Sequence, residues 1–582
     1  MSNFPRRRPG PDAPGDLSPV EDGRAGRSLR SRPPETVMRL ARLGAFHQTR
    51  LSFLRATLRQ VAAGGYRFGY DRWEIGDDGT GTAVYAARGP ERACSLVCFA
   101  HDLDPAMRTD RVIAEAWDAT YILYDGIPDD SEIDRLRANV PKQEAGRYRH
   151  TDLILSRTNK SARLFDHVVD CLAGGQQPAA ERIDETGYVM RTTAVYGNGK
   201  FGIADRQRYA ARAGFGGPFR MEMLAVWMIR QFVADLVDYM AQARGGAGAV
   251  PLDRVLRRRL GIGNSTGLGL GPFIVNHPAL FARWIECREL ALARVCARER
   301  ASPETRRDFR QWIARARADT AAWTVADPMQ AERIARLAVD LDRLDAFAVG
   351  LGPEIAAPWA AIRDWAGEHL SLEGQELTMS LLIEPHGDLV DDLADRMAIE
   401  EKEMLPAGIS GSVRDLRGCI EEGHGWALEP DYARPDAQAR FWYVSANKLE
   451  PRLGERWEEP GADLELPLAT GRDIAACHTD LGRAMQDEPL ADFLLRHPEH
   501  RHTVRRLCDP ELGSYGQIRD NLVGADLLPL DLLRCKLAFF GATRFDPKSD
   551  RWLRINMFCH APYPDELHAM PPDDWVYPCP DG

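Results

Sequence analysis

The spacing of apolar residues changes several times along the chain, and each change marks an expected element. Residues 1–34 show no periodic apolar positions and are rich in Arg, Pro, Gly and Asp, which predicts a disordered leader. From Thr36 to Val61 apolar residues recur every three or four positions, up to the stop signal Gly64-Gly65. One amphipathic helix is therefore expected to open the fold.

Strand-like runs follow, with turn signals such as Asp78-Gly79 between them. They predict an antiparallel meander. Its expected strands are Tyr66–Ile75, Gly81–Ala87 and Ala93–Ala100. Further along, Thr120–Tyr124 and Leu153–Leu155 could add strands, Ala162–Leu172 a helix, and Tyr188–Val195 a last strand.

Helical spacing dominates from about residue 205 to residue 405. Long helices are expected at Pro272–Arg300, Pro303–Trp323, Pro328–Val349 and Glu354–Leu370. The most apolar helix, Met221–Met240, carries Glu222, Arg230, Asp235 and Asp238. Those charges indicate a buried core helix and not a membrane span.

Beyond Pro406 glycine, proline and tryptophan become frequent, and strand-like runs return at Phe441–Val444, Leu537–Phe540 and Trp552–Phe558. The predicted fold is α+β and predominantly helical. Its expected parts are a small mixed domain with an antiparallel sheet at 35–204, an all-helical domain at 205–405, a C-terminal α+β segment at 406–570 and a tail at 571–582.

Composition narrows the class of protein. The formal net charge of -11 and the isoelectric point near 5.8 argue against nucleic acid as the main partner, because binding phosphates needs a basic face. The eleven cysteines contain no Cys-x-x-Cys pair, so a reducing cytosol fits better than a disulfide framework or a zinc ribbon. We expect a cytoplasmic protein without a membrane anchor, and a homo-oligomer stays open.

Two glycine-rich loops carry the best functional signal. The first is Tyr196–Gly202, and the second is Gly261–Pro272, directly after the basic stretch Arg254–Arg259. Glycine lets backbone amides approach a ligand, so such loops beside cationic side chains are typical of an anion site. The expected binding residues are Arg191, Asn198, Asn264, Ser265 and Thr266, and the expected acid–base residues are Lys200 and His277.

Each loop also has a structural interpretation. Gly197-Asn198-Gly199 is a standard hairpin signal, and the glycines at 267, 269 and 271 could serve close helix packing. Gly263–Gly267 matches the Gly-x-Ser-x-Gly string of serine hydrolases, which needs a strand before the serine and a helix after it. Because Asp253–Leu260 is predicted as a basic helix, we expect no strand before the serine. A P-loop also needs a preceding strand, so it is not expected here either.

Other polar motifs are weaker. Asp391, Asp392 and Asp395 are expected to form a solvated acidic helix face. His497, His500 and His502 lie among arginines with no carboxylate at a fixed spacing, which predicts a solvated helix end and no metal site. Ser445-x-x-Lys448 is a chance match, and the remaining isolated polar positions are His101, His424 and His560.

These patterns favour a cytosolic enzyme acting on a small anionic substrate that carries a carboxylate or a phosphate. No cofactor fingerprint accompanies the loops, so lyase or isomerase chemistry by acid–base groups is favoured over redox chemistry. The alternatives are a non-catalytic interaction scaffold built on arginine-rich helices, and a serine hydrolase acting through Ser265.

Overall fold

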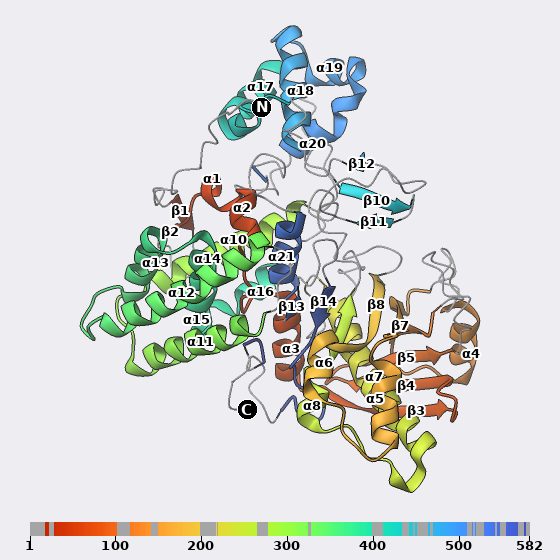
Figure 1. Cartoon of the computed structure of the whole chain (residues 1–582). Helices are drawn as coiled ribbons and strands as arrows, with labels where there is room; N and C mark the ends of the chain where they lie inside the picture. The colour runs from red at the N-terminus through yellow and green to blue at the C-terminus, as the bar shows by residue number, and fades with distance from the viewer. Residues whose placement is uncertain are drawn as a thin grey trace, which may run out of the picture.

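A computed structural model describes most of the chain. The described residues are 18–21, 28–101, 117–140, 149–197, 217, 219–264, 278–323, 328–397, 411–432, 441–445, 448–450, 464–465, 470–508, 515, 518–519, 529–541, 544–546, 554–568 and 575–577. Among them the fold is α+β and predominantly helical, as the sequence predicts. Figure 1 shows a sheet at the lower right, a layer of helices at the left, and a small helical lobe at the top.

The sheet has nine strands in the order β13-β14-β9-β8-β7-β6-β5-β4-β3. All neighbouring strands are antiparallel except β8 and β9, which are parallel. The predicted meander and the three further strands are confirmed. The strands are β3 (Arg67–Ile75), β4 (Gly81–Arg88), β5 (Ala93–Ala100), β6 (Ala119–Asp125), β7 (Asp152–Lys160), β8 (Tyr188–Gly197), β9 (Gly261–Asn264), β13 (Arg544–Asp546) and β14 (Arg554–Met557).

The long helix α7 (Arg220–Gly245) makes the parallel pair possible, because a parallel connection needs a crossover that returns the chain to the same edge. It packs on one face of the sheet beside α5 (Phe165–Ala173), and its Phe232 ring contacts Tyr121 and Trp73. Helix α8 (Arg254–Arg259) then leads into β9. Helix α6 (Ala180–Thr186) precedes β8.

The opposite face of the sheet has its own apolar cluster. Val97, Ile122 and Leu155 pack there against Ile133 and Leu136 of α4 (Asp130–Asn139). Strands β4, β5 and β6 are therefore covered by helix on each face, which explains why they are apolar on both sides.

The helical layer confirms the predicted helices of the middle segment. It consists of α10 (Pro278–Cys296), α11 (Pro303–Ala321), α12 (Pro328–Gly350), α13 (Pro358–His369), α14 (Leu372–Ile383), α15 (Gly387–Val390) and α16 (Leu393–Arg396). Helices α3 (Phe53–Ala63) and α21 (Pro529–Phe540) lie between this layer and the sheet (Figure 1). No helix of the described residues is both long enough and apolar enough to cross a membrane.

Two predictions about these elements need correction. The single helix expected from Thr36 to Val61 is three helices, α1 (Pro34–Val37), α2 (Leu40–Gly44) and α3. The chain leaves helical geometry before Ser52, whose buried hydroxyl accepts from the Thr49 amide and donates to the Ala538 carbonyl. The strand expected at Leu537–Phe540 is the end of α21, since a short buried apolar run fits either element.

The N-terminal leader also ends earlier than expected. Strand β2 (Ser28–Ser31) pairs with β1 (Ser18–Glu21) and packs on α10, and Leu29 and Arg32 are buried. The expectation of disorder through residue 34 is therefore wrong for Ser18–Glu21 and for Ser28–Pro34. The prediction failed because burial of this segment depends on one leucine and one arginine, which give no periodic apolar pattern.

The segment after residue 405 divides in two. Strands β13 and β14 join the large sheet through β9. A separate lobe has its own core, with Ile420, Cys477 and Phe493 at 0% exposure. Its elements are α17 (Val413–Gly423), α18 (Thr470–Arg483), α19 (Leu490–Arg496), the 3-10 turn η8 (Pro498–His500) and α20 (Arg501–Cys508). The same segment of the chain contains a separate three-stranded sheet of β10 (Phe441–Ser445), β11 (Lys448–Glu450) and β12 (Leu464–Glu465).

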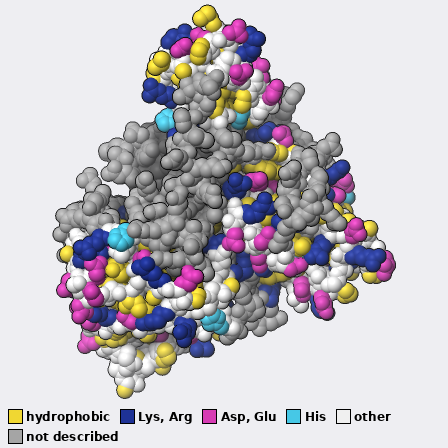
Figure 2. Space-filling view, turned by 180° about the vertical axis from the view of Figure 1, so that it is seen from behind, with side chains coloured by type: hydrophobic (Ala, Val, Ile, Leu, Met, Phe, Trp, Pro, Cys, Tyr) yellow, Lys and Arg dark blue, Asp and Glu magenta, His cyan; other side chains and the backbone are white. Residues whose placement is uncertain are grey.

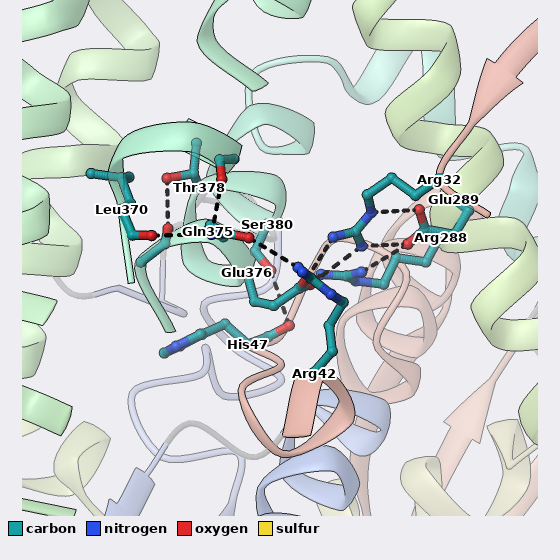
Figure 3. A network of polar contacts seen from close by, with 12 residues as sticks. Arg32, Arg42, His47, Arg288, Glu289, Leu370, Gln375, Glu376, Thr378 and Ser380 are labelled. Atoms are coloured by element: carbon teal, nitrogen blue, oxygen red, sulfur yellow. Dashed lines mark hydrogen bonds and ion pairs between the residues drawn. The ribbon is translucent and has the colours of Figure 1, made fainter. Parts of the chain in front are cut away.

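A buried ion network joins the N-terminal segment to the helical layer (Figure 3). The fully buried carboxylate of Glu376 on α14 accepts from Arg32, from Arg42 at 2.8 Å and from Arg288 on α10 at 2.8 Å. Arg32 also holds Glu289 through two hydrogen bonds of 2.7 and 2.8 Å. Burial alone would raise the pKa of Glu376, but Arg32, Arg288 and Arg42 lower it far below its ordinary value.

A neighbouring branch of the network involves a histidine. The His47 Nε2 atom lies 2.9 Å from Glu373, which also pairs with Arg534 of α21. Burial and the charge of Arg534 lower the pKa of His47, so its imidazole is neutral and donates this hydrogen bond.

We expect Glu376→Gln to lower the free energy of unfolding by about 3–5 kcal/mol, because it leaves three buried guanidiniums without their shared carboxylate. Urea denaturation at pH 7 measures this change. Glu286→Gln on α10 is the matched control, since its pair with Arg283 is exposed and should be worth less than about 1 kcal/mol. Equal stability of wild type and Glu376→Gln would contradict the account.

The same interaction predicts acid sensitivity. The folded-state pKa of Glu376 lies below the unfolded value of about 4.3, so its contribution is fully present above that pH and is lost as the pH falls further. The stability difference between wild type and Glu376→Gln should accordingly shrink below about pH 4. Urea midpoints at a series of pH values test this, and a difference independent of pH would argue against it.

Candidate functional site

The structure describes two of the residues that the sequence assigns to an anion site. Arg191 lies on β8, and Asn264 is the last residue of the adjacent parallel strand β9. Lys200, His277, Asn198, Ser265 and Thr266 lie outside the described residues, so their roles stay predictions. Both glycine-rich loops continue from the carboxyl ends of parallel neighbours, so they leave the sheet at the same edge.

The register separates Arg191 from Asn264. Arg191 pairs with Gly263, whereas Asn264 pairs with Thr192, the next residue of β8. Because successive side chains of a strand point to opposite faces, Arg191 and Asn264 face opposite sides of the sheet. Arg191 is also six residues before Gly197, about 20 Å at the rise of a strand, so it does not lie beside the start of the Lys200 loop.

Strand β9 revises the view of Ser265. The sequence predicts a basic helix with no strand before this serine, but α8 ends at Arg259 and Gly261–Asn264 forms a strand of the sheet. The objection to a nucleophile elbow or a P-loop on that side is therefore wrong. The next described helix, α10, begins only at Pro278. The elbow needs a helix directly after the serine, and the residues at which it would begin lie outside the described residues.

A patch on the α4 face of the sheet has the polar groups that suit an anion. It comprises His101, Trp117, Thr120, Arg157 and Arg191, and we call it the guanidinium patch. Thr120 on β6 pairs with Arg157 on β7, and Asn159, two residues on from Arg157, pairs with Arg191 on β8. Arg157 and Arg191 are thus diagonal neighbours on one face, within reach of each other's long side chains.

The side chains around Arg157 are well packed. Its guanidinium lies 4.4 Å from the centre of the Trp117 ring, and both residues are only 6% exposed. The Trp117 indole N–H is buried and has no hydrogen-bond partner in the described part of the chain. A buried donor of this kind costs free energy unless something accepts from it.

Arg191 differs from most arginines of this protein. Its side chain is half-buried, and within the described residues it makes no hydrogen bond or ion pair. The neighbouring acid, Asp118, already accepts from the Lys160 amide at 2.7 Å. The guanidinium patch therefore holds two cations at a partly desolvated surface, where attraction for an anion is stronger than in water.

His101 adds a titratable group to the patch. It follows β5, and its Nε2 atom lies 3.1 Å from the Thr120 hydroxyl. Burial lowers its pKa, and Asp118 opposes that shift only in part. The imidazole is consequently neutral at pH 7 and able to accept a proton.

The sequence analysis identified Arg191 and His101 but missed Trp117, Thr120 and Arg157. A usable signal existed in β7, where the polar residues Arg157 and Asn159 lie two positions apart and so share one face of the strand. Trp117 and Thr120 give no such signal, because a tryptophan or a threonine beside a strand is ordinary core material.

The three aspartates expected on a solvated helix face have arginine or glutamine partners. Asp391 receives two hydrogen bonds from Arg50, at 2.6 and 2.9 Å. Asp392 pairs with Arg294, and Asp395 accepts from Gln60. The expectation is wrong for Asp391 and Asp392, whose ion pairs with Arg50 and Arg294 dock α15 and α16 on the rest of the helical layer. Asp395 is exposed, as expected.

The other isolated positions remain structural. Burial lowers the pKa of His424 to about 4, and the His560 amide donates to the Arg258 carbonyl. Ser445 and Lys448 are paired residues of β10 and β11. Basic and acidic side chains lie interspersed over the coloured parts of the face that Figure 2 shows.

Comparisons with protein-family models, with curated proteins and with solved structures gave no match. The guanidinium patch must accordingly be judged on its own geometry.

Gly263 offers a test of the packing around β9. A Cβ atom at this position would come within 2.7 Å of the Tyr188 ring. We expect Gly263→Ala to lower the free energy of unfolding by about 1–3 kcal/mol through overpacking. Gly69→Ala on β3, where nothing lies within 4 Å, is the control and should change stability little in thermal denaturation. Equal effects of the two replacements would refute this close contact.

Proposed function

We propose that this protein binds a small anionic ligand, a carboxylate or a phosphate compound, at the guanidinium patch. The observation that carries the proposal is the half-buried guanidinium of Arg191, which has no ion-pair partner among the described residues and lies diagonal to Arg157. Two guanidiniums on one face match the geometry of a carboxylate or phosphate group.

The surroundings of the patch support this assignment. The Trp117 N–H needs an acceptor, and an anion oxygen supplies one. The Thr120 hydroxyl and the Arg157 guanidinium are held in place by the sheet and by the Trp117 ring, so the patch loses little side-chain entropy on binding.

Acid–base catalysis of the lyase or isomerase type is the second part of the proposal. His101 is neutral, half-buried and next to the groups that would orient the ligand, as a general base requires. Lys200 and His277 stay sequence predictions on which the proposal does not depend. A non-catalytic scaffold is the competing function, and it gives no reason for anion binding at Arg191.

Anion binding should stabilise the protein. We expect sulfate or phosphate to raise the melting temperature relative to chloride at equal ionic strength, with a gain of about 2.7 kcal/mol at a ligand concentration one hundred times Kd. Arg191→Gln should remove this gain. The matched control is Arg88→Gln on β4, because Arg88 is already paired with Asp71 and is exposed.

Two results would count against the proposal. The absence of anion-specific stabilisation across sulfate, phosphate and common carboxylates favours the scaffold. An equal loss of stabilisation in Arg88→Gln would show that the anions act on the general surface charge and not on the patch.

The pH dependence separates binding from proton transfer. Protonation of His101 adds a positive charge to the patch, so sulfate should bind more tightly as the pH falls below the ordinary imidazole value of about 6.5 and through the lowered pKa of His101. Sulfate suits this titration because its charge is constant in the range. His101→Gln should bind sulfate without this pH dependence, and an unchanged dependence would remove His101 from the patch.

A further inference from the structure

Four potential metal ligands meet in the small helical lobe, far in sequence from the guanidinium patch. They are Asp480 of α18, His497 at the end of α19, and Glu499 and His500 of η8. One ligand atom from each of the four lies within 4.8 Å of the others. The sequence hypothesis that these histidines lack a carboxylate partner is wrong, because folding brings Asp480 and Glu499 to them.

The spacing inside the cluster suits a metal ion. His500 Nε2 lies 2.9 Å from an oxygen of Asp480, and His497 Nδ1 lies 3.1 Å from an oxygen of Glu499. A tetrahedral ion at about 2.0–2.2 Å from each ligand needs ligand atoms roughly 3.4 Å apart. These two pairs are already near this separation, and all four ligand atoms lie within 4.8 Å of one another, so side-chain rotations can bring them around one ion.

The two imidazoles are held from behind by a phenylalanine. Phe493, at 0% exposure, stacks on His497 with ring centres 4.8 Å apart and on His500 at 6.1 Å. The backbone fixes the turn as well, since the His497 amide donates to Phe493 and the His500 amide donates to His497. His500 is buried and not solvated as the sequence suggested. Such preorganisation lowers the entropic cost of binding an ion.

Two arginines near the cluster have acidic partners, which reduces the repulsion of a cation that the sequence suggested. Arg496 is paired with Glu488, and Arg483 holds the Oδ1 oxygen of Asp480 while Oδ2 faces His500. The cluster therefore presents two carboxylates and two imidazoles to its centre, with Arg483 in an outer position.

We propose that Asp480, His497, Glu499 and His500 form a binding site for a divalent transition-metal ion of the zinc type. Two imidazole nitrogens and two carboxylate oxygens are ligands that Zn²⁺ and related ions accept, whereas Mg²⁺ and Ca²⁺ prefer sites made of oxygen alone. The ion would link α18 to the turn between α19 and α20, and so clamp the lobe across its core.

The test is metal binding by the full chain after treatment with a chelator and removal of the chelator. Wild type should take up about one more equivalent of Zn²⁺ than His500→Ala when measured by equilibrium dialysis and elemental analysis. Glu499→Gln is the second variant, because its side chain is exposed and its loss of affinity cannot come from misfolding. Co²⁺ in place of Zn²⁺ should give a tetrahedral visible spectrum in wild type that both variants weaken.

The lobe supplies a matched control. His478 lies 3.0 Å from Glu421 and so forms a histidine–carboxylate pair without the other two ligands. His478→Ala should bind Zn²⁺ as wild type does. Equal Zn²⁺ uptake by wild type and by both cluster variants would overturn the proposal, and so would uptake lost equally in His478→Ala. Saturable uptake of Mg²⁺ that competes with Zn²⁺ at this site would overturn the assignment to the zinc type.

Discussion

The carboxylate of Glu376 is the centre on which much of the chain arrangement depends. It accepts from Arg32 and Arg42 of the N-terminal segment and from Arg288 of α10, all within the protein interior. Burying a guanidinium without a carboxylate costs far more free energy than burying it with one. Separating the N-terminal segment, α10 and α14 would therefore be strongly unfavourable. This constraint explains why residues before the first long helix are fixed on the helical layer although they carry few apolar side chains.

The same logic continues to the C-terminal strands. Glu373, one turn before Glu376, pairs with Arg534 of α21, and the chain returns from α21 to the sheet as β13 and β14. There Arg230 of α7 links the segments, because its buried guanidinium donates hydrogen bonds to the carbonyl oxygens of Leu260, Ala561 and Arg258. The parallel strand β9 and the C-terminal chain are therefore held together by one arginine, in addition to their own ladder.

These contacts also explain which parts of the fold could be predicted. The strands β3 to β8 and the helices α7 and α10 to α13 have periodic apolar positions and clear turn signals, and the sequence identifies them. Strand β9 was missed because Gly261–Asn264 is short and contains two glycines, so it has almost no side-chain pattern. The predictions for the leader and for the end of α21 failed for other reasons. Burial of the leader depends on an ion pair with a residue hundreds of positions away. The end of α21 was predicted as a strand because a short buried apolar run fits either element.

The candidate site could be predicted only in part, because contacts between distant segments decide which residues lie together. The sequence could point to Arg191 and His101, but only the register of β6, β7 and β8 shows that Arg157 lies on the face of Arg191 and that Asn264 does not. Asp480 of the His497 and His500 cluster could not be assigned either, because it reaches the histidines from another helix, whereas Glu499 stands between them in the sequence.

The way in which this protein pairs its buried arginines makes the lack of a partner at Arg191, among the described residues, informative. The chain has 75 basic residues, of which only seven are lysines, so an arginine by itself says little about function. Buried arginines here are regularly matched: Arg55 by Glu384 through two hydrogen bonds, Arg288 by Glu289 and Glu376, and Arg230 by three carbonyl oxygens. Where matching is the rule, a half-buried guanidinium on the central sheet without a partner in the described structure requires its own explanation. An external anion is the partner whose charge and geometry fit Arg191.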